Sequence, residues 1–462
     1  MELIGIITKN QILEVKISDV TASGDGVAKI EGYPLFIKGG VTGDVLCVTV
    51  TKTNKSYGFA RIERIIAPSP FRAEAPCPVF EACGGCDFMH IDYNQQKKIK
   101  SDTVENNLRR LGGAKDFEYE EIIGADSIYN YRNKAQFPIG KVKGRIVCGF
   151  YSKKSHDIIP CSGCMIQNED INKAVELFLE YANENRLSVY DEKKHRGLLR
   201  HIYVRSGNKT NEILVVIVTN SQKPLPSEGA LTEKLSALKN IKGIIQNINT
   251  EKTNLVLGDK NRVIWGDGYI TSCIGDLKFN ISPQSFFQVN GEQTERLYSK
   301  ALEYAGITED DTVFDLYCGV GSISLFLARS AKKVIGVEIV EKAIENAKEN
   351  AKLNSIDNAE FHAGDCGIVV DRLIKNGEKA DVVVVDPPRK GCSEDLLVLI
   401  QKMSPKKLVY VSCNSATLAR DVKYLEENGF KLRKVCAVDL FPMSGHCEAV
   451  ALLQQLSLPR GK

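Results

Sequence analysis

The sequence predicts a multidomain α/β protein with a small OB-like β-barrel, a central mixed α/β domain and a Rossmann-like domain in that order. Three observations support this prediction: five short β-prone runs at the start, closely spaced cysteines after them, and alternating helices and apolar strands beyond residue 290. The length of 462 residues agrees with roughly two to four domains. We place the domains at residues 1–66, 67–275 and 276–462.

The composition is that of an ordinary soluble globular chain, with 43% apolar and 26% charged residues. The start, Met1–Ile6, has no basic segment followed by a long apolar run, and no stretch is long enough to span a bilayer. We therefore expect a cytoplasmic protein without membrane contact. The net charge of +3 permits a nucleic-acid partner but does not argue for one.

The first domain is predicted from β-prone runs at Ile12–Ile17, Gly26–Ile30, Tyr33–Ile37, Asp44–Val50 and Gly58–Ile65. Glycine-bearing turns separate several of them, which is typical of a sandwich or an OB-like barrel. Late in this unit, four cations surround Tyr57 and Phe59: Lys52, Lys55, Arg61 and Arg64. Such a patch can hold single-stranded nucleic acid, although a solvated β surface explains it equally well. Ala67–Pro70 reads as a linker.

Fourteen cysteines without a secretory signal indicate a reducing compartment, where thiols serve metals or catalysis. Cys77, Cys83 and Cys86 have the spacing C-x5-C-x2-C around a Gly-Gly turn and can converge on one ion or cluster. A fourth thiolate can come from Cys161 or Cys164. Four thiolates suit structural zinc or an iron–sulfur cluster, and the spacing leaves both open. Merely packed cysteines are less favoured, because Pro and Gly neighbours make poor core.

The rest of the central domain is predicted to be mixed α/β. A helix-like segment at 94–112 and a helix at Ile171–Asn185 accompany strands that begin after Tyr129 and recur at Leu198–Arg205, Glu212–Thr219, Gly243–Ile248 and Leu255–Leu257. Tyr129–Lys134 mixes aromatic and cationic side chains, which can stack on and pair with RNA. An ordinary polar strand edge is the alternative.

The third domain is predicted to be doubly wound, with a largely parallel sheet. Its helices and strands alternate at Gln293–Tyr304, Thr312–Leu316, Ser322–Ser330, Lys333–Val337, Glu341–Asn354, Ala359–His362, Asp381–Val385, Leu396–Met403 and Leu408–Val411.

A ligand site is predicted where these strands end. The turn Asp315–Gly321 carries two glycines that let the backbone approach a ligand, although the third glycine of a dinucleotide fingerprint is absent. Glu338 ends the next strand, where an acid can grip ribose hydroxyls. Asp386 ends a third strand, and the following Pro-Pro holds a loop towards the site; a turn cap is the alternative for Asp386.

A thiol lies at the end of a fourth strand. Cys413 follows Leu408–Val411, and ligands of open α/β sheets bind outside the carboxyl ends of the strands. We interpret it as a candidate nucleophile, with an inert buried cysteine as the alternative. Glu448 and His446, taken alone, are more typical of surface residues.

Taken together, five features resemble the RNA uracil-5-methyltransferase family: the cysteine spacing, Asp315–Gly321, Asp386–Gly391, Ser412–Asn414 and His446–Glu448. Within it the chain resembles the bacterial 23S ribosomal RNA branch, which carries a TRAM domain and a [4Fe–4S] cluster. The resemblance covers nearly the whole chain. It implies an RNA (uracil-5-)-methyltransferase that uses S-adenosylmethionine, with a TRAM barrel at 1–66 and a methyltransferase domain at 276–462.

The resemblance also implies the roles of individual residues. It assigns the cluster to Cys77, Cys83, Cys86 and Cys164, and prefers Cys164 to Cys161 because Met-Ile-Gln follows it. It assigns the S-adenosylmethionine site to Gln288, Asp315, Tyr317, Gly319, Glu338 and Asp386. Cys447 replaces a branched apolar residue of the family, from which we expect no loss of function.

The chemistry of the reaction calls for the same residue types. Carbon 5 of uracil is a poor nucleophile, and a thiolate that adds at carbon 6 makes it electron-rich. Cys413 suits this role, for which we expect a lowered pKa. Glu448 is the candidate base for the carbon-5 proton, and Asp386 can hydrogen-bond the uracil edge. The target base has to be flipped into the pocket.

RNA, most of all 23S ribosomal RNA, is the expected partner; no obligate protein partner is implied, and we expect a monomer. One alternative is C5 methylation of uracil 54 in tRNA, against which the TRAM-like start argues only by analogy. A non-catalytic, metal-dependent RNA-binding protein is disfavoured by the set Cys413, Glu448 and Asp386. A redox protein is disfavoured because no second cofactor motif is present.

Overall fold

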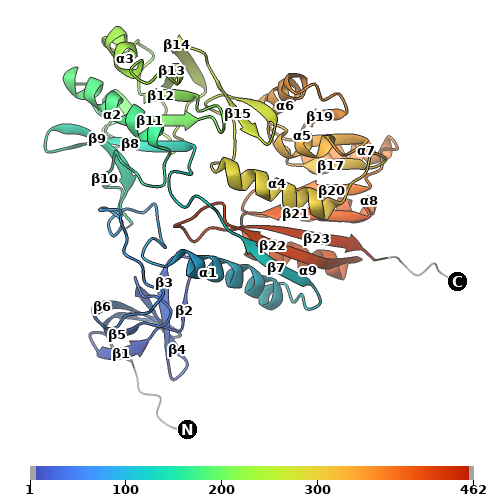
Figure 1. Cartoon of the computed structure of the whole chain (residues 1–462), viewed down its shortest axis with the longest axis horizontal. Helices are drawn as coiled ribbons and strands as arrows, with labels where there is room; N and C mark the ends of the chain where they lie inside the picture. Colours follow the sequence, from blue (N-terminus) through green and yellow to red (C-terminus); the bar gives the residue numbers. More distant parts are fainter. Residues whose placement is uncertain (1–6, 154, 457–462) are drawn as a thin grey trace.

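The computed structural model describes residues 7–153 and 155–456. The segment Met1–Ile6, on which the expected absence of a signal peptide rests, lies outside the described residues. Figure 1 shows an amino-terminal β-domain in blue, a central sheet with its helices in green, and a larger α/β part in yellow to red. In the part of the chain that the structure describes, no helix has the length and apolar character needed to cross a membrane.

The amino-terminal domain is one six-stranded sheet with the order β1-β5-β6-β4-β3-β2. Its strands are β1 (Ile12–Lys16), β2 (Asp19–Val20), β3 (Asp25–Ile30), β4 (Tyr33–Lys38), β5 (Val45–Thr53) and β6 (Gly58–Ala67). Alternate residues such as Leu35, Ile37, Leu46 and Val48 are fully buried, as the period of a strand requires. The five strands predicted from the sequence are confirmed, and the short β2 is added.

The central part is a seven-stranded sheet with the order β10-β9-β8-β11-β12-β13-β14, against which α2 packs. Its elements are β8 (Lys134–Val142), β9 (Arg145–Tyr151), β10 (Ile158–Pro160), α2 (Glu169–Glu184), β11 (Leu199–Ser206), β12 (Ile213–Thr219), α3 (Glu228–Leu235), β13 (Ile241–Ile248) and β14 (Lys260–Gly266). A hairpin of β15 (Ile270–Ile274) and β16 (Leu277–Ile281) follows.

The predicted strand at Leu255–Leu257 is wrong. Leu255 is 70% exposed, and the amide of Asn249 donates to the carbonyls of Leu255 and Val256 at 2.8 and 3.1 Å. These side-chain bonds replace a strand ladder, so the segment is a loop.

The carboxy-terminal part is an eight-stranded sheet with the order β19-β18-β17-β20-β21-β23-β22-β7. Its elements are α4 (Gly291–Ala305), β17 (Thr312–Leu316), α5 (Ser322–Ala328), β18 (Lys333–Glu338), α6 (Glu341–Leu353), β19 (Ala359–Ala363), α7 (Cys366–Lys375), β20 (Val382–Val385), α8 (Glu394–Met403), β21 (Lys407–Ser412), α9 (Ser415–Glu427), β22 (Phe430–Val438) and β23 (Glu448–Gln455). The predicted alternation is confirmed; α7 and β22 were not predicted.

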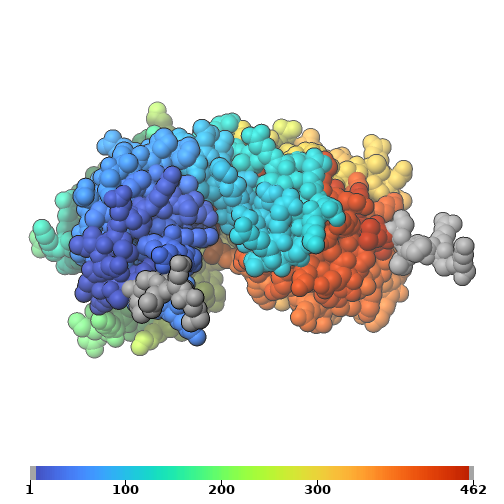
Figure 2. Space-filling model, turned by 90° about the horizontal axis from the view of Figure 1, so that it is seen from below, coloured from blue at the N-terminus to red at the C-terminus, as the bar shows by residue number. Residues whose placement is uncertain are grey.

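One strand of this sheet comes from far upstream. β7 (Glu118–Ile123) pairs in parallel with β22, and it follows α1 (Tyr93–Asn106) and the short π-helix η1 (Asn107–Leu111). Val104 and Leu108 join the same buried core as Leu418 of α9. Residues 93–123 therefore complete the carboxy-terminal core, although they precede residue 276. Seen from below, the blue amino-terminal domain and the orange carboxy-terminal part lie on opposite sides, with blue and cyan segments between them (Figure 2).

Candidate active site

One cavity of about 980 Å³ collects almost all of the predicted site residues. It is lined by the five candidate metal ligands Cys77, Cys83, Cys86, Cys161 and Cys164, and by Gln288, Tyr317, Gly319, Glu338, Asp386, Cys413, His446 and Glu448. Asp315 is fully buried beneath it and does not line it. The structure thus brings together residues that were predicted separately from three regions of the chain.

The sheet explains this convergence. Strands β17, β18, β20 and β21 are parallel, so Tyr317, Glu338, Asp386 and Cys413 leave the sheet at the same edge. Strand β23 runs antiparallel to β21, with Ser412 opposite Ala449. The first residue of β23 therefore lies beside the last residues of β21, which places Glu448 near Cys413.

The thiol of Cys413 is half-buried, and its environment raises its pKa to about 11. Burial is the main cause, and the carboxyl groups of Glu448 and Asp386 act in the same direction, whereas the Arg389 guanidinium opposes them. The expectation of a lowered pKa is therefore wrong, because burial and two nearby carboxyl groups outweigh the effect of one cation.

Two carboxyl groups share this environment, those of the buried Glu448 and the partly exposed Asp386. Burial and, secondarily, Asp386 raise the pKa of Glu448 to about 8; burial and then Asp315 raise the pKa of Asp386 to about 7. Arg389 acts in the opposite direction on Glu448. Carboxyl groups with pKa values near the working pH can exchange protons with a substrate, as an acid–base site requires.

The Gly-bearing turn after β17 offers a cradle for a ligand. Tyr317 and Gly319 have φ values of +70° and +55°, and a Cβ placed on Gly319 would meet no atom within 4 Å. The Gly319 amide donates to Glu338 Oε2 at 3.3 Å, and the Val340 amide donates to Oε1 at 3.0 Å. This turn and the Glu338 carboxylate therefore form a pre-arranged polar edge of the cavity.

Asp315 supports that turn from below. Its Oδ2 accepts from the Ser324 hydroxyl at 2.5 Å, while its Oδ1 is buried without a partner among the described residues. Burial is the main cause that raises its pKa to about 7. An orphaned buried oxygen next to an open, glycine-lined turn fits a site completed by a polar ligand.

The candidate metal ligands face one another across the other end of the cavity. Burial, followed by the charges of Cys164, Cys83 and Cys77, raises the pKa of the Cys86 thiol to about 12. The Gly85 amide donates to Cys83 Sγ at 3.3 Å. A hydrogen bond from Cys161 and, after it, backbone amides lower the pKa of the Cys164 thiol.

The cysteines line the cavity together. Among the described residues, no three His, Cys, Asp or Glu side chains lie close enough together to hold one metal ion. Four thiolates suit either structural zinc or an iron–sulfur cluster.

Some residues of the cavity were not predicted, and one predicted role changes. Arg389 was not singled out, although it stands three residues after Asp386 in the loop predicted to face the site, which was an available signal. Arg132 and Lys134 line the cavity, as their proposed contact with RNA requires. The Tyr131 hydroxyl, however, donates to the Pro442 carbonyl at 2.9 Å, so this ring is part of the structure around the site.

The fold and the site define a methyltransferase of RNA. Residues 92–363, more than half of the chain, match the family described as tRNA (Uracil-5-)-methyltransferase. Residues 8–62 match the TRAM domain, and residues 307–440 match a methyltransferase domain. The chain belongs to the RNA uracil-5-methyltransferase family.

Its relatives agree with this assignment along their whole length. The chain is 48% identical over 449 residues to a protein of Halalkalibacterium halodurans named as an uncharacterized RNA methyltransferase, covering 97% of this chain and 98% of the relative. A protein of Clostridium tetani with the same name is 47% identical over 448 residues and covers 97% of both chains.

A solved structure has the same architecture. The tRNA (uracil-54, C5)-methyltransferase of Pyrococcus abyssi, in complex with S-adenosyl-L-homocysteine, matches with a TM-score of 0.77 and 27% identity. The match covers 96% of this chain and 100% of that chain.

Proposed function

We propose that this chain transfers a methyl group from S-adenosylmethionine to carbon 5 of a uridine in 23S ribosomal RNA. The observation that carries the proposal is the meeting of Cys413, Asp386 and Glu448 in one cavity with the turn Asp315–Gly321. The cytoplasm, where ribosomal RNA is made and modified in bacteria, is the expected place of action.

The cofactor site is proposed at the carboxyl ends of β17 and β18. Glu338 suits the ribose hydroxyls, and Gln288, Tyr317, Gly319 and Asp386 line the same cavity. S-adenosylmethionine supplies an electrophilic methyl group on a sulfonium. The S-adenosyl-L-homocysteine in the Pyrococcus abyssi structure supports this choice of donor.

The proposed reaction uses Cys413 as a nucleophile. Its sulfur bonds to carbon 6 of the flipped uracil, and the thiol proton passes to a neighbouring carboxylate. The resulting enolate attacks the methyl group from carbon 5, the bond between the methyl group and the sulfonium breaks, and S-adenosylhomocysteine leaves. Glu448 then takes the carbon-5 proton, the bond between sulfur and carbon 6 breaks, and the double bond of the ring is restored.

Asp386 and Arg389 are proposed to set the charge balance of this step. Asp386 is placed to hydrogen-bond the uracil edge on which the enolate oxygen develops, and Arg389 is the cation that counteracts the raised pKa of both Cys413 and Glu448. Arg389 therefore favours the charged forms that addition and proton removal require.

The cysteines at the other end are proposed to hold a [4Fe–4S] cluster. Cys77, Cys83, Cys86 and Cys164 are its proposed ligands; the cluster would join the segment 77–86 to the loop before α2. This joint stiffens the wall of the cavity beside the hairpin that carries Glu448. The domain boundaries at 66 and 275 likewise stay proposals.

The substrate RNA has a second candidate. The Pyrococcus abyssi neighbour is described as acting on uracil 54 of tRNA, and it matches the whole chain. A labelled-methyl assay on 23S ribosomal RNA and on tRNA, both from cells that lack this chain, distinguishes the two. Methylation of ribosomal RNA supports the proposal, methylation of tRNA alone replaces the substrate, and methylation of neither contradicts both.

The role of Cys413 is tested by the Cys413→Ala variant. Methyl transfer is expected to fall on the order of 10⁴-fold or more, because catalytic residues that act together lose almost all of their activity when the nucleophile is removed. Binding of S-adenosylmethionine, measured by calorimetry, is expected to stay unchanged. Cys273→Ala, a buried cysteine outside the cavity, is the matched control and is expected to keep full turnover.

A further inference from the structure

The turn between β22 and β23 connects directly to Glu448. Val438, the last residue of β22, is the cross-strand partner of Glu448, and Asp439 follows it immediately. The Cys447 thiol lies 3.5 Å from the Val438 carbonyl and closes the base of the turn. Contacts that fix Asp439 therefore act one residue away from the pair of Val438 and Glu448, and Glu448 is the proposed base.

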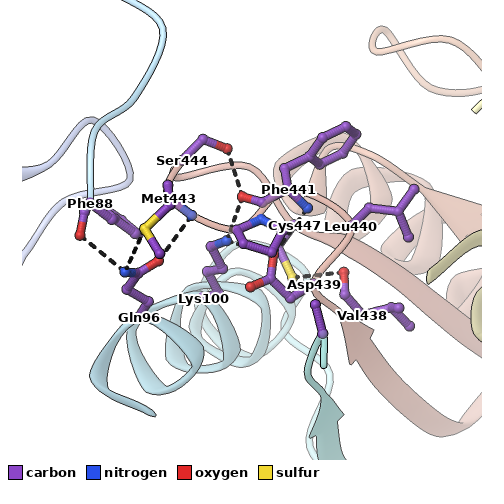
Figure 3. A network of polar contacts seen from close by, with 12 residues as sticks. Phe88, Gln96, Lys100, Val438, Asp439, Leu440, Phe441, Met443, Ser444 and Cys447 are labelled. Atoms are coloured by element: carbon purple, nitrogen blue, oxygen red, sulfur yellow. Dashed lines mark hydrogen bonds and ion pairs between the residues drawn. The ribbon is translucent and has the colours of Figure 1, made fainter. Parts of the chain in front are cut away.

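A fully buried ion pair holds Asp439. Lys100 Nζ of α1 donates to Asp439 Oδ1 at 2.6 Å, and both side chains have no exposed surface (Figure 3). The same ammonium group donates to the Phe441 carbonyl at 2.9 Å. The Phe441 amide donates to Asp439 Oδ1 at 3.1 Å, and the Tyr93 hydroxyl donates to Oδ2 at 3.1 Å.

A second contact lies one helical turn earlier on α1. The buried Gln96 accepts from the Met443 amide at 3.1 Å and donates to the Phe88 and Ile91 carbonyls at 3.1 and 2.8 Å (Figure 3). The Met443 carbonyl in turn accepts from the Asp87 and Phe88 amides at 2.9 and 3.0 Å. Met443 has a φ of +68°, a conformation that these contacts hold in place.

These contacts join the turn to the cysteine segment. Asp87 and Phe88 follow directly after Cys86, a proposed cluster ligand, so one network links the thiols, α1 and the turn before Glu448. The link consists of the Gln96 and Lys100 side chains, the Asp439 carboxylate, and backbone atoms of residues 87–88 and 441–443.

A buried ion pair contributes little to the net stability of a fold. Removing two charges from water costs about as much as their attraction returns, and apolar pairs often stabilise a core equally well. The pair here is instead connected to backbone groups of a turn that lines the catalytic cavity through Phe441, Ser444 and His446. Its geometry is directional, which an apolar contact is not.

We propose that Lys100 and Asp439 are positioning residues for Glu448, with Gln96 as their support. The ion pair fixes the β22–β23 turn on α1 and thereby sets the place of the Glu448 carboxyl relative to carbon 5 of the bound uracil. The proposal rests on the proposed function, in which Glu448 removes the carbon-5 proton.

The consequence is a selective defect in the last chemical step. Neither Lys100 nor Asp439 lines the cavity, so RNA and S-adenosylmethionine bind as before. Cys413 directly follows β21, outside the β22–β23 hairpin, and still adds to carbon 6. A displaced Glu448 removes the proton slowly, because proton transfer depends steeply on distance. The methylated RNA then stays bonded to Cys413.

The test uses the double variant Lys100→Met/Asp439→Asn. It keeps the side-chain sizes and leaves no unpaired charge in the core. We expect kcat to fall about 10- to 100-fold, with KM for RNA changed less than about threefold. A methyl-labelled enzyme–RNA adduct is expected to accumulate on a denaturing gel, as in the Glu448→Gln variant.

The chain offers a matched control on the same helix. Lys98 and Asp102 form an ion pair at 2.7 Å with side chains 63% and 49% exposed. Lys98→Met/Asp102→Asn removes the same charges from the surface of α1. It is expected to leave kcat and the adduct level unchanged.

A second variant keeps the test decisive if the double variant does not fold. Gln96→Met removes the bond to the Met443 amide without a change of charge, and the adduct is expected to accumulate here too. A folded double variant with the kcat and adduct level of the parent overturns the proposal. Unfolding of both variants also overturns it, because the network is then structural only.

Failure of the proposed function gives a different result. In that case the parent enzyme does not methylate uridine, and Glu448→Gln forms no adduct. If Glu448→Gln accumulates the adduct while both network variants behave like the parent, only the positioning proposal fails.

Discussion

The burial and ionisation of Glu448 matter most for the proposed reaction. This residue is 3% exposed, and burial followed by the nearby Asp386 raises its pKa to about 8. A carboxyl group with this pKa holds a proton near neutral pH and releases it readily when a nearby cation or a bound substrate stabilises the carboxylate. Arg389 is the cation placed to do so.

The first prediction concerns the pH dependence of turnover. Glu448 accepts a proton only in its charged form, so kcat/KM is expected to rise with pH through about 8, its pKa in the free protein. Cys413, with a pKa raised to about 11, acts in the same direction. Initial rates at saturating S-adenosylmethionine between about pH 6 and 9 measure this. A rate that falls across this range would contradict the role of Glu448.

The second prediction concerns stability. The folded protein keeps a proton on Glu448 up to about pH 8, whereas the unfolded chain loses it near its ordinary value of 4.5. The free energy of unfolding therefore loses a contribution as pH rises from 4.5 to 8. Since one pKa unit corresponds to about 1.4 kcal/mol, Glu448→Gln is expected to be a few kcal/mol more stable than the parent at about pH 8.

Urea unfolding at two pH values checks this prediction. The gain of Glu448→Gln is expected to disappear near pH 4.5, where both chains carry an uncharged group at this position. Glu14→Gln, at an exposed position of β1, is the control. An equal gain at both pH values would show that packing, and not ionisation, is responsible.

For single residues, the sequence could predict which residue types form the candidate site, but it could not predict their pKa values. The roles of Asp386, Cys413 and Glu448 could be predicted because each residue stands at the end or the start of an apolar run in the sequence. The raised pKa of Cys413 depends first on burial and then on two carboxyl groups from other strands, and only the folded sheet provides both.

At the scale of elements, the antiparallel strand β23 decides the composition of the site. It enters the sheet between β21 and β22, and its register places Ala449 opposite Ser412. A shift by one residue would turn Glu448 to the other face of the sheet. The ion pair of Lys100 with Asp439 acts on the same hairpin from outside the sheet.

The third prediction separates Cys164 from Cys161. Anaerobically prepared Cys164→Ser is expected to lose most of its iron and of its visible absorbance, because one of four thiolate ligands is missing. Cys161→Ser, three residues before Cys164 in the same loop, is the matched control and is expected to retain both. The reverse result would exchange their roles, and zinc in place of iron in the parent would replace the cluster.

The predictability of the elements depended on the range of their contacts. Strands such as β17, β18 and β21 were predicted because each is a short apolar run bounded by turn residues. The place of β7 could not be predicted, because Glu118–Ile123 is polar in sequence and gains its partner only from β22, far along the chain. The loop at Leu255 was mistaken for a strand because the bonds from Asn249 were not visible in the pattern.

At the scale of the whole molecule, three parts of the chain meet at the turn before Glu448. A Cβ on Gly445 would lie 1.6 Å from the Ala22 carbonyl of the TRAM domain, so these backbones touch. A Cβ on Gly24 would likewise lie 2.7 Å from the Asp87 carbonyl. The TRAM domain is thus seated against both the cysteine segment and the catalytic hairpin.

The fourth prediction concerns the outer face of the TRAM domain. Phe36, Tyr57 and Phe59 form a cluster with ring centroids 5.6 to 5.9 Å apart, and Tyr57 and Phe59 are each 38% exposed. Stacking of a base on an aromatic ring contributes about 1–3 kcal/mol. Phe59→Ala is therefore expected to weaken RNA binding about 5- to 100-fold at constant salt.

Filter binding with the substrate RNA measures this effect. Ile12→Ala, which removes a 67% exposed apolar side chain from β1 of the same domain, is the control and is expected to bind normally. Equal affinity of both variants would show that this face of the TRAM domain does not contact the RNA.

The central claim is that Cys413 bonds to carbon 6 of uracil during methylation. The most direct measurement is incubation with RNA that carries 5-fluorouridine in place of uridine, in the presence of S-adenosylmethionine. Fluorine at carbon 5 cannot leave as a proton, so we predict an adduct that survives denaturation, contains the transferred methyl group and is absent in Cys413→Ala. Methylation of ordinary RNA by the enzyme without any such adduct on fluorinated RNA would contradict the account.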